Sequence, residues 1–226
     1  MVNSFLKYLV SKLYPYWSSL YYLANFKNKN AVMYPNAFLM KRIFIDPNKV
    51  SFYTSLPVKP KKGTLYFLPG NWDENLPEFD YKTSSNFKYK TAYEILKHNT
   101  PLSKTSEYKH VDEIIKKTGN YRGYSDTLEY MNTIKSLYNS IINNGYVTRR
   151  KLLNNWVGEV EFALGRSGRL IKINSGNHRF SCSRILNIKK IPINVCVIHD
   201  DYYSEFEEGG FKAINKLLHD VETEYK

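Results

Sequence analysis

The chain has 226 residues, which is enough for one domain with its own core and short for two. Hydrophobic residues make up 42% and charged residues 24%, proportions that exclude a disordered chain and are ordinary for a folded soluble protein. The two cysteines, Cys182 and Cys196, have no Cys or His neighbour at zinc spacing and cannot form a disulfide framework. We therefore expect a reducing compartment and a cytoplasmic location.

The net charge of +12 is concentrated at the beginning of the chain. Residues 1–70 contain ten Lys or Arg and a single acid, Asp46, which gives +9 and leaves +3 for the other 156 residues. A basic, aromatic segment can lie on anionic lipid, contact nucleic acid or dock on an acidic partner, or it can be a solvated basic face. The composition leaves these alternatives open.

Residues 1–35 are expected to form an N-terminal amphipathic helical segment, bent or divided at Pro15, because apolar side chains recur there at three- and four-residue steps. Such a helix either packs on its own domain or binds peripherally to an anionic membrane surface. The longest uncharged stretch, Leu13 to Phe26, has 14 residues and is too short to span a bilayer. We expect residues 36–226 to form a single domain.

The middle of the chain carries weaker signals. Apolar runs predict strands over residues 39–46 and 64–68, and residues 72–90 look like a loop with little periodicity. A helix is expected over residues 106–118, ended by Gly119.

The clearest predicted helix begins at Asp126, which forms a capping box with Glu129, and ends at Gly145. A continuous apolar stripe is expected along it, made of Leu128, Met131, Ile134, Leu137, Tyr138, Ile141 and Ile142. This helix must therefore lie on an apolar core.

The last third of the chain predicts a β-hairpin followed by a helix and a strand. Residues 160–164 and 170–173 alternate as the two strands of the hairpin. At residue 175 the period changes from two to 3.6, which predicts a helix over residues 177–186 before a buried strand at 191–198. The order of elements indicates an α+β, α/β-like fold.

The most specific chemical signal is the turn Ser175-Gly176-Asn177-His178-Arg179, where the strand enters the helix. The first N–H groups of a helix lack intrahelical acceptors and its dipole adds positive charge, so such a turn favours phosphate. Gly176 would let a ligand approach the backbone, His178 adds a donor, and Arg179 can hold phosphate through two parallel bonds. A His and an Arg at a helix start can equally be structural.

The elements around this turn resemble the ParB/sulfiredoxin superfamily over residues 128–199. Sulfiredoxins carry G-G-C-H-R at the turn, archaeal free-serine kinases of the same fold carry D-G-H-H-R, and ParB proteins carry G-E-R-R and bind CTP. In all three the turn and helix start bind nucleotide phosphates. The resemblance implies a ParB/sulfiredoxin-like domain with added N-terminal helices. It also implies a nucleotide site at Ser175, Gly176, Asn177, His178 and Arg179.

A closer resemblance covers nearly the whole chain and concerns an uncharacterised ParB-like family with a G-D-W-D motif. Here that motif is Gly70-Asn71-Trp72-Asp73, and the segments at 44–50, 105–108 and 142–146 follow the order of the family. Its members are often encoded among glycan-biosynthesis genes. The resemblance implies the fold more than an activity.

Several positions depart from these relatives. Asn177 stands where sulfiredoxin has its nucleophilic cysteine, and an amide cannot become a thiolate, so sulfiredoxin chemistry is excluded. Ser175 replaces an Asp of many relatives, and Cys182 fits a small packing residue. No helix-turn-helix segment follows, so a partition role is not expected.

A phosphotransferase also needs a carboxylate that accepts the substrate proton or holds Mg²⁺. Asp73 is the candidate base, with His178 as the other candidate catalytic residue, and Asp73 and Asp46 are the candidate metal ligands. Asp73 can also be a turn residue and Trp72 a core anchor. Arg122, Arg149 and Arg150 could contact phosphate or face solvent.

These patterns predict a nucleotide-dependent phosphotransferase that uses ATP, ADP or CTP, with Mg²⁺ as the candidate metal, and acts on a small polar or glycan-related acceptor. One alternative is a nucleic-acid-binding or nuclease-like ParB-related protein, which the charge of +12 favours. The other is a nucleotide-binding module without catalysis.

Overall fold

The computed structural model describes residues 33–35, 43–56, 64–80, 84, 86–148, 159–173, 175–204 and 210–226. Within these residues the chain combines helices with one mixed β-sheet, and it is therefore an α+β protein, as expected.

The sheet is built around β7 (Ile191–His199), whose nine residues are all buried. The strand order within the described residues is β1-β4-β7-β5-β6-β3, and β2 pairs with the first part of β7. Strands β4 and β5 run parallel to β7, whereas β2 runs antiparallel to it. The remaining strands are β1 (Met33–Pro35), β2 (Ile43–Ile45), β3 (Phe52–Tyr53), β4 (Thr64–Leu68), β5 (Val160–Leu164) and β6 (Leu170–Lys172).

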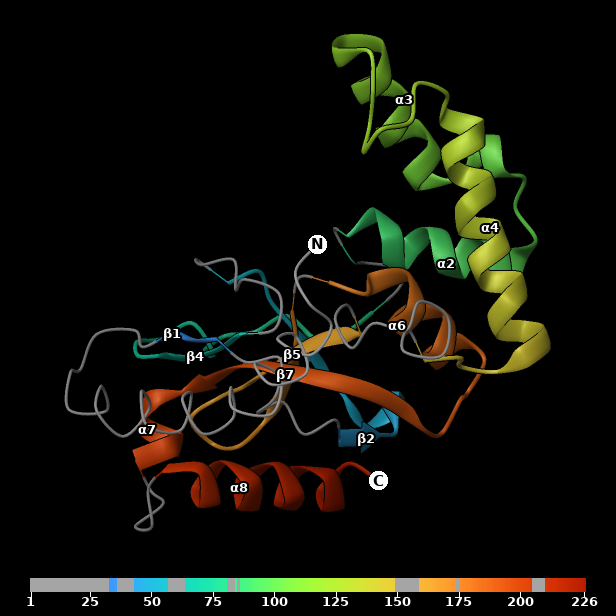
Figure 1. Cartoon of the computed structure of the whole chain (residues 1–226). Helices are drawn as coiled ribbons and strands as arrows, with labels where there is room; N and C mark the ends of the chain where they lie inside the picture. Colours follow the sequence, from blue (N-terminus) through green and yellow to red (C-terminus); the bar gives the residue numbers. More distant parts are fainter. Residues whose placement is uncertain are drawn as a thin grey trace, which may run out of the picture.

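Helices cover both faces of the sheet, which explains why β7 is buried along its whole length, including the polar Asn194 and His199. Helix α8 (Gly210–Glu224) runs along one face, while α6 (Asn177–Ile185) and α2 (Phe87–His98) lie on the opposite side (Figure 1). Apolar side chains from α6, the sheet and α8 belong to one buried cluster. The short helix α7 (Asp200–Ser204) follows directly from β7.

Residues 87–144 form a helical arm that stands out from the sheet (Figure 1). It consists of α2, the 3-10 turn η2 (Leu102–Lys104), α3 (Ser106–Thr118) and α4 (Thr127–Asn144). The arm has its own apolar cluster, which also takes in Cys182 and Ile185 of α6. Helix α6 therefore separates the core of the sheet from the core of the arm.

Several expectations about local structure are met. Asp126 caps α4 by accepting a hydrogen bond of 2.7 Å from the N–H of Glu129, and the β5–β6 hairpin and α6 form where the change of period predicts them. Cys182 is fully buried in the arm cluster, and burial raises the pKa of its thiol to about 12, so it packs as an inert small residue.

Other expectations are wrong. The loop predicted over residues 72–90 ends early, because α2 begins at Phe87 behind the N-cap Asn86. Leu128 and Ile142, assigned to the buried stripe of α4, are 48% and 51% exposed, because the arm covers a narrower face of that helix. Residues 210–224, for which no element was predicted, form α8.

The expected N-terminal helical segment falls almost entirely outside the described residues. Its last three positions, Met33–Pro35, form β1, so the segment does not extend to residue 35. The cause is the antiparallel pairing of these residues with Thr64–Tyr66 of β4. Across the described ranges, no helix is long and apolar enough to cross a membrane.

Candidate functional site

The predicted turn leads directly from β6 into α6, and Gly176 is the N-cap of that helix. Gly176 has a φ of 81°, and a Cβ at this position would lie 2.8 Å from the Cα of Val160. The left-handed backbone and the packing against β5 both demand glycine here. The side of Gly176 that lacks a side chain therefore faces the sheet, not an approaching ligand as the sequence suggested.

A buried lysine that the sequence reasoning missed lies beneath this turn. Lys172 is fully buried, and its Nζ donates to the carbonyl oxygens of Ile173 and Ser175 and to Oδ1 of Asn177. The last two distances are 2.7 and 2.9 Å. Tyr89 of α2 also donates to Oδ1 of Asn177, at 3.2 Å. The oxygen atoms of the turn are thus bound from the inner side.

Burial lowers the pKa of Lys172 to about 7, and the Glu161 carboxylate opposes this shift. Three oxygen acceptors match the three N–H donors of an ammonium group. Lys172 therefore places a group that titrates near neutral pH directly under the start of α6.

His178, a candidate catalytic residue, points into the helical arm. Its Nδ1 lies 2.8 Å from the hydroxyl of Tyr138, and its Nε2 lies 3.2 Å from Oε1 of Glu107. The second contact has the distance of an ion pair but not the alignment of a hydrogen bond, since Nε2 of His178 has no hydrogen-bond partner among the described residues. Oε2 of Glu107 also has no hydrogen-bond partner among them. Both ring nitrogens face protein groups, so His178 ties α6 to α3 and α4.

Glu107 is fully buried at the start of α3 and remains a carboxylate. Burial by itself raises its pKa, but the His178 ring and the hydroxyl of Tyr130, which donates to Oε1 at 2.7 Å, together hold the pKa below its usual value. The backbone N–H of Glu107 donates to Oγ1 of Thr91 on α2. A buried polar cluster thus connects the arm to the second residue of α6.

Arg179 is also turned inward, so it does not hold a phosphate as expected. Its Nη1 lies 3.2 Å from Oε2 of the buried Glu159, its Nη2 donates to the carbonyl oxygen of Val147, and its guanidinium lies 4.2 Å from the centre of the Tyr146 ring. Only 5% of the residue is exposed. Arg179 therefore joins α6 to the segments on either side of residues 149–158.

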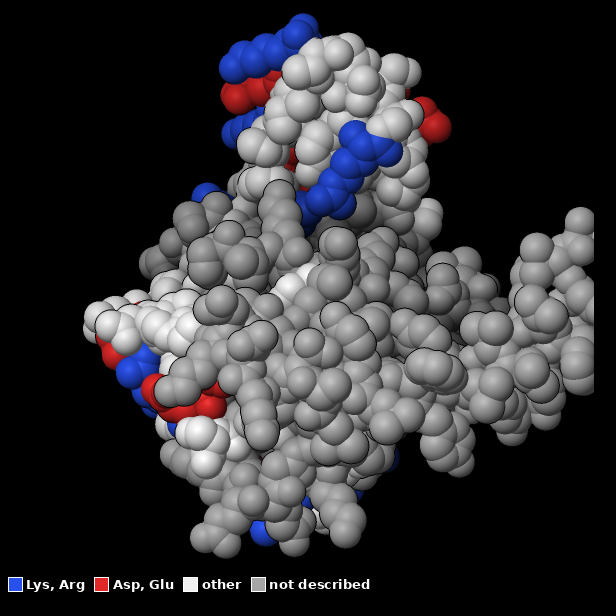
Figure 2. All heavy atoms as spheres, turned by 60° about the vertical axis from the view of Figure 1, so that its left-hand side comes forward, with Lys and Arg blue, Asp and Glu red and all other residues white. Residues whose placement is uncertain are grey.

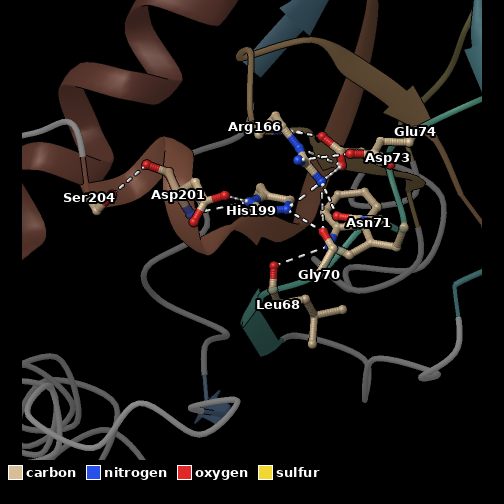
Figure 3. A network of polar contacts seen from close by, with 10 residues as sticks. Leu68, Gly70, Asn71, Asp73, Glu74, Arg166, His199, Asp201 and Ser204 are labelled. Atoms are coloured by element: carbon tan, nitrogen blue, oxygen red, sulfur yellow. Dashed lines mark hydrogen bonds and ion pairs between the residues drawn. The ribbon is translucent and has the colours of Figure 1, made fainter.

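The second predicted motif, Gly70-Asn71-Trp72-Asp73, folds around Arg166 in the β5–β6 turn (Figure 3). Oδ2 of Asp73 accepts the backbone N–H of Arg166 at 2.7 Å, and Oδ1 accepts from its Nε and Nη2 at 3.1 and 3.0 Å. Nη2 also donates to the carbonyl of Gly70 and to Asn71. These hydrogen bonds connect the end of β4 to the β5–β6 hairpin.

His199, at the end of β7, completes this network. Its Nε2 lies 2.7 Å from the carbonyl oxygen of Gly70 and 3.7 Å from Oδ1 of Asp73. Its ring stacks on Trp72, whose Nε1 donates to the carbonyl oxygen of Leu68. Since Nδ1 accepts the backbone N–H of Asp201, the neutral ring carries its proton on Nε2 and donates it to Gly70.

Asp73 is therefore poorly suited to act as the catalytic base. Although burial raises its pKa, the hydrogen bonds from Arg166 outweigh burial and hold the pKa of this carboxyl below its usual value. A carboxylate with a depressed pKa, both of whose oxygens accept from Arg166, has little tendency to take a substrate proton.

The structure does not bring Asp73 and the turn at Gly176 together. A Cβ on Gly165, just beyond the end of β5, would lie 2.8 Å from Oδ2 of Asp73, whereas Gly176 packs on Val160 at the beginning of β5. Five residues of extended chain span about 16 Å. The expected single centre containing both motifs is not formed.

The candidate metal ligands, Asp73 and Asp46, do not belong to a cluster of metal-binding residues within the described ranges. Asp46 caps the 3-10 turn η1 (Pro47–Lys49) by accepting from the N–H of Asn48, and it lies 3.4 Å from Nζ of Lys189. Within the described ranges, no group of three or more His, Cys, Asp or Glu residues could hold a metal ion.

Comparison with known proteins finds no family model, no curated protein and no solved structure that matches this chain. The resemblance to the ParB/sulfiredoxin superfamily thus rests on the residues of the chain alone.

Proposed function

We propose that this protein is a nucleotide-dependent phosphotransferase that acts on a small polar or glycan-related acceptor and holds its nucleotide phosphates at the start of α6. The observation that carries the proposal is the left-handed Gly176 turn from β6 into α6, underlain by the buried Lys172. Such a helix start offers backbone N–H groups and a positive dipole to phosphate.

Because the side chains of the motif point inward, the proposal assigns phosphate binding to the backbone of the turn and not to these side chains. Among the described residues, no side chain caps the start of α6. His178 and Arg179 bind protein groups, and Lys172 binds the oxygen atoms of the turn from beneath. The backbone N–H groups, with the charge of Lys172 below them, would then bind the phosphate, while His178 and Arg179 hold the turn in shape.

Transfer from this site would depend on positioning and charge stabilisation more than on a dedicated base, as is usual for phosphoryl transfer. ATP, ADP or CTP is the proposed donor. Mg²⁺ would be bound mainly by the phosphates of the nucleotide and by water, with few protein ligands, which agrees with its habit in such sites.

A thermal-shift panel of ATP, ADP, CTP and GTP, with and without Mg²⁺, tests the proposal. Binding to the folded state at a hundredfold excess over Kd stabilises by about 2.7 kcal/mol, which for a chain of this size corresponds to about 5–10 °C in Tm. Transfer of the labelled terminal phosphate to sugars, polyols and amino acids is then followed. No shift with any nucleotide would overturn the proposal, and binding without transfer would favour a nucleotide-binding module.

A negative charge introduced at the turn makes this test specific. Asn177→Asp keeps the shape of the side chain and gives Lys172 an anionic partner, but it places a negative charge where the phosphate would bind. We expect it to fold and to lose the nucleotide shift. Asn132→Asp is the matched control, because Asn132 is exposed on α4 and the change in net charge is the same.

A further inference from the structure

The buried Lys172 determines how the turn before α6 is oriented. Its Nζ donates to the carbonyl oxygen of Ser175 at 2.7 Å, and the backbone N–H of Glu161 on β5 donates to the same oxygen at 3.3 Å. The Ser175 carbonyl therefore points toward β5 and Lys172. A trans peptide unit is planar and directs its C=O and its N–H to opposite sides, so the N–H of Gly176 points away from Lys172.

The opposite side of the turn is partly exposed to solvent. Residues 175–178 are all partly exposed, and the first N–H groups of a helix have no intrahelical acceptor. The side chain of Asn177 does not cap these groups, because its Oδ1 accepts from Nζ of Lys172 at 2.9 Å and from the hydroxyl of Tyr89 at 3.2 Å. Lys172 thus holds oxygen atoms of the turn on the inner side and leaves the N–H groups to the outer side.

This arrangement requires the charged form of Lys172. Its Nζ has three oxygen acceptors, which include the carbonyl of Ile173, and they match the three N–H donors of an ammonium group. A neutral amine has two donors and a lone pair, so one of the three oxygens would lie against that lone pair. All three acceptors are neutral, and none of the described carboxylates lies within 4 Å of Nζ.

Burial makes this charged form costly. Lys172 is fully buried, and the rings of Phe162 and Phe180 lie 5.9 and 6.0 Å from Nζ. Such an environment disfavours an ammonium group, and burial lowers the pKa of Lys172 to about 7. Lys172 therefore gains or loses a proton near neutral pH. The titratable groups around it are Glu161 on β5 and Cys196 on β7, which oppose this shift, Lys88 on α2, which adds to it, and Tyr53, its register partner on β3.

We infer that Lys172 is the positioning residue of the phosphate site and that a phosphate anion binds at the start of α6 together with a proton, which Lys172 takes up. The inference deepens the proposed function and rests on it. With its proton, Lys172 holds the Ser175 carbonyl and the Asn177 amide inward, and the turn offers its N–H groups to the anion. Without the proton, the turn loses both the positive charge beneath it and one of its three hydrogen bonds.

A phosphate on the outer side would in turn stabilise the ammonium form. A ligand oxygen that accepts the N–H of Gly176 would lie about 8 Å from Nζ, because a single peptide unit separates the two. At an effective dielectric constant of about 20, one negative charge at that distance raises the pKa of an ammonium group by about 1.5. The proton comes from the buffer, and by linkage the affinity for the anion falls as the pH rises above about 7.

The exposed cations of the arm provide a contrast. Figure 2 shows Lys and Arg side chains on the surface of the arm, above the body of the protein. A solvated ammonium group is already protonated between about pH 7 and 9, so it attracts an anion without taking up a proton. Lys117, which is exposed in the last turn of α3, is a cation of this kind.

Isothermal titration calorimetry of the full chain tests the coupling, with ATP, ADP, CTP and GTP between about pH 6 and 9, with and without Mg²⁺. Titrations in two buffers of different ionisation enthalpy give the number of protons taken up on binding. Above about pH 7.5 a terminal phosphate is fully ionised, so uptake there belongs to the protein. The variants are Lys172→Met, which removes the titrating group, and Lys117→Met, the matched control with the same change in net charge.

We expect the wild type to take up more than about half a proton per nucleotide near pH 8, and its Kd to rise about fivefold or more between pH 7.5 and 9. Lys117→Met should keep this proton uptake and this pH profile. Lys172→Met should bind about fivefold or more weakly at pH 7.5, with no proton uptake and a flat profile above that pH. A purely structural role of Lys172 would not produce proton uptake in the wild type.

Nucleotide binding without proton uptake, and with a constant Kd above about pH 7.5, would overturn the coupling and leave the proposed function standing. No binding at any pH would overturn both. Uptake that persists in Lys172→Met would assign the proton to another group. If Lys172→Met does not fold, an NMR titration of isotope-labelled lysine side chains in the wild type decides. The lysine that titrates near neutral pH must then titrate at a higher pH once nucleotide is bound, and an unchanged titration would disprove the coupling.

Discussion

The two ends of the β5–β6 hairpin offer a direct comparison. At one end, the Gly70-Asn71-Trp72-Asp73 loop directs its side chains toward Arg166 and His199, and hydrogen bonds connect the loop with both. At the other end, the turn before α6 also directs its charged side chains inward, but none of the described side chains caps its helix start. The first end is a network of side-chain hydrogen bonds, and the second is a helix start whose turn is bound from beneath by Lys172.

The comparison teaches that a motif rich in Asp, His and Arg need not expose any of them. Arg179 and Asp73 are both among the most buried charged side chains near their respective ends, and each is matched by an oppositely charged group. What distinguishes the two ends is the backbone: a left-handed glycine followed by a helix at residue 176. The predictions below test this difference, from the largest expected effect to the smallest.

Arg179→Ala should destabilise the protein by about 3–5 kcal/mol, because it removes the cation beside the buried carboxylate of Glu159, to which the Tyr146 hydroxyl still donates, and frees the carbonyl of Val147. The measurement is urea unfolding, with Lys135→Ala on the exposed face of α4 as the control. The paired change Arg179→Met with Glu159→Gln should recover part of the loss. A change below about 1 kcal/mol together with lost nucleotide binding would mean that Arg179 contacts ligand after all.

Lys172 should give the folded state a characteristic pH dependence. Its pKa is about 7 when folded and near the ordinary 10.5 when unfolded, so between these values the unfolded chain binds the extra proton and stability rises with pH. The slope contributed by this one group approaches about 1.4 kcal/mol per pH unit and vanishes below pH 7. Unfolding of wild type and Lys172→Met between pH 6 and about 10 isolates it, since only the wild type should show this slope. Parallel pH profiles would show that Lys172 keeps its ordinary pKa.

The fold was predictable wherever the pattern is local. The hairpin, the change of period at residue 175 and the capping box at Asp126 depend on neighbours in the chain, and all three were predicted. Helix α2 was missed because its buried residues, Tyr89, Thr91 and Ala92, give little apolar periodicity.

Helix α8 was missed although its apolar stripe was visible at Ala213, Ile214, Leu217, Leu218 and Val221. These positions have the regular three- and four-residue spacing of an amphipathic helix. The sequence therefore carries a local signal for this helix.

The candidate site was predictable in position and not in orientation. Residues 175–179 do form a strand-to-helix turn, but the partners that draw Arg179 and Asp73 inward are Glu159, 20 residues away, and Arg166, 93 residues away. No periodicity encodes such pairs. Lys172 was overlooked because a lysine is almost never fully buried unless it is paired, and its acceptors here are oxygens of the turn itself.

Asp73→Asn should destabilise the protein by about 2 kcal/mol, because an amide cannot accept from Arg166 through both atoms and the charge-assisted bonds are lost. Nucleotide affinity should not change, since Asp73 lies at the far end of β5. The pKa of Asp73 is depressed in the folded state, so the stabilisation is present above the unfolded value near 3.8 and is lost as the pH falls through the folded one. Lost transfer activity with normal stability would restore Asp73 as a base.

Trp72→Phe should produce the smallest effect, and it tests how the Gly70-Asn71-Trp72-Asp73 loop is held in place. Phenylalanine keeps an aromatic ring on His199 but cannot donate to the carbonyl oxygen of Leu68, which now accepts from Nε1 at 3.1 Å. A neutral hydrogen bond of this kind contributes about 1 kcal/mol, and Trp72 is only partly buried, so the freed carbonyl can still reach water. We therefore expect a loss of about 1 kcal/mol in urea unfolding, with an unchanged nucleotide shift. A loss of about 3 kcal/mol or more would mean that the indole fills the core beneath β4 and that its hydrogen bond is incidental. Trp72→Ala measures that packing term separately, because it removes the stacked ring and the donor together.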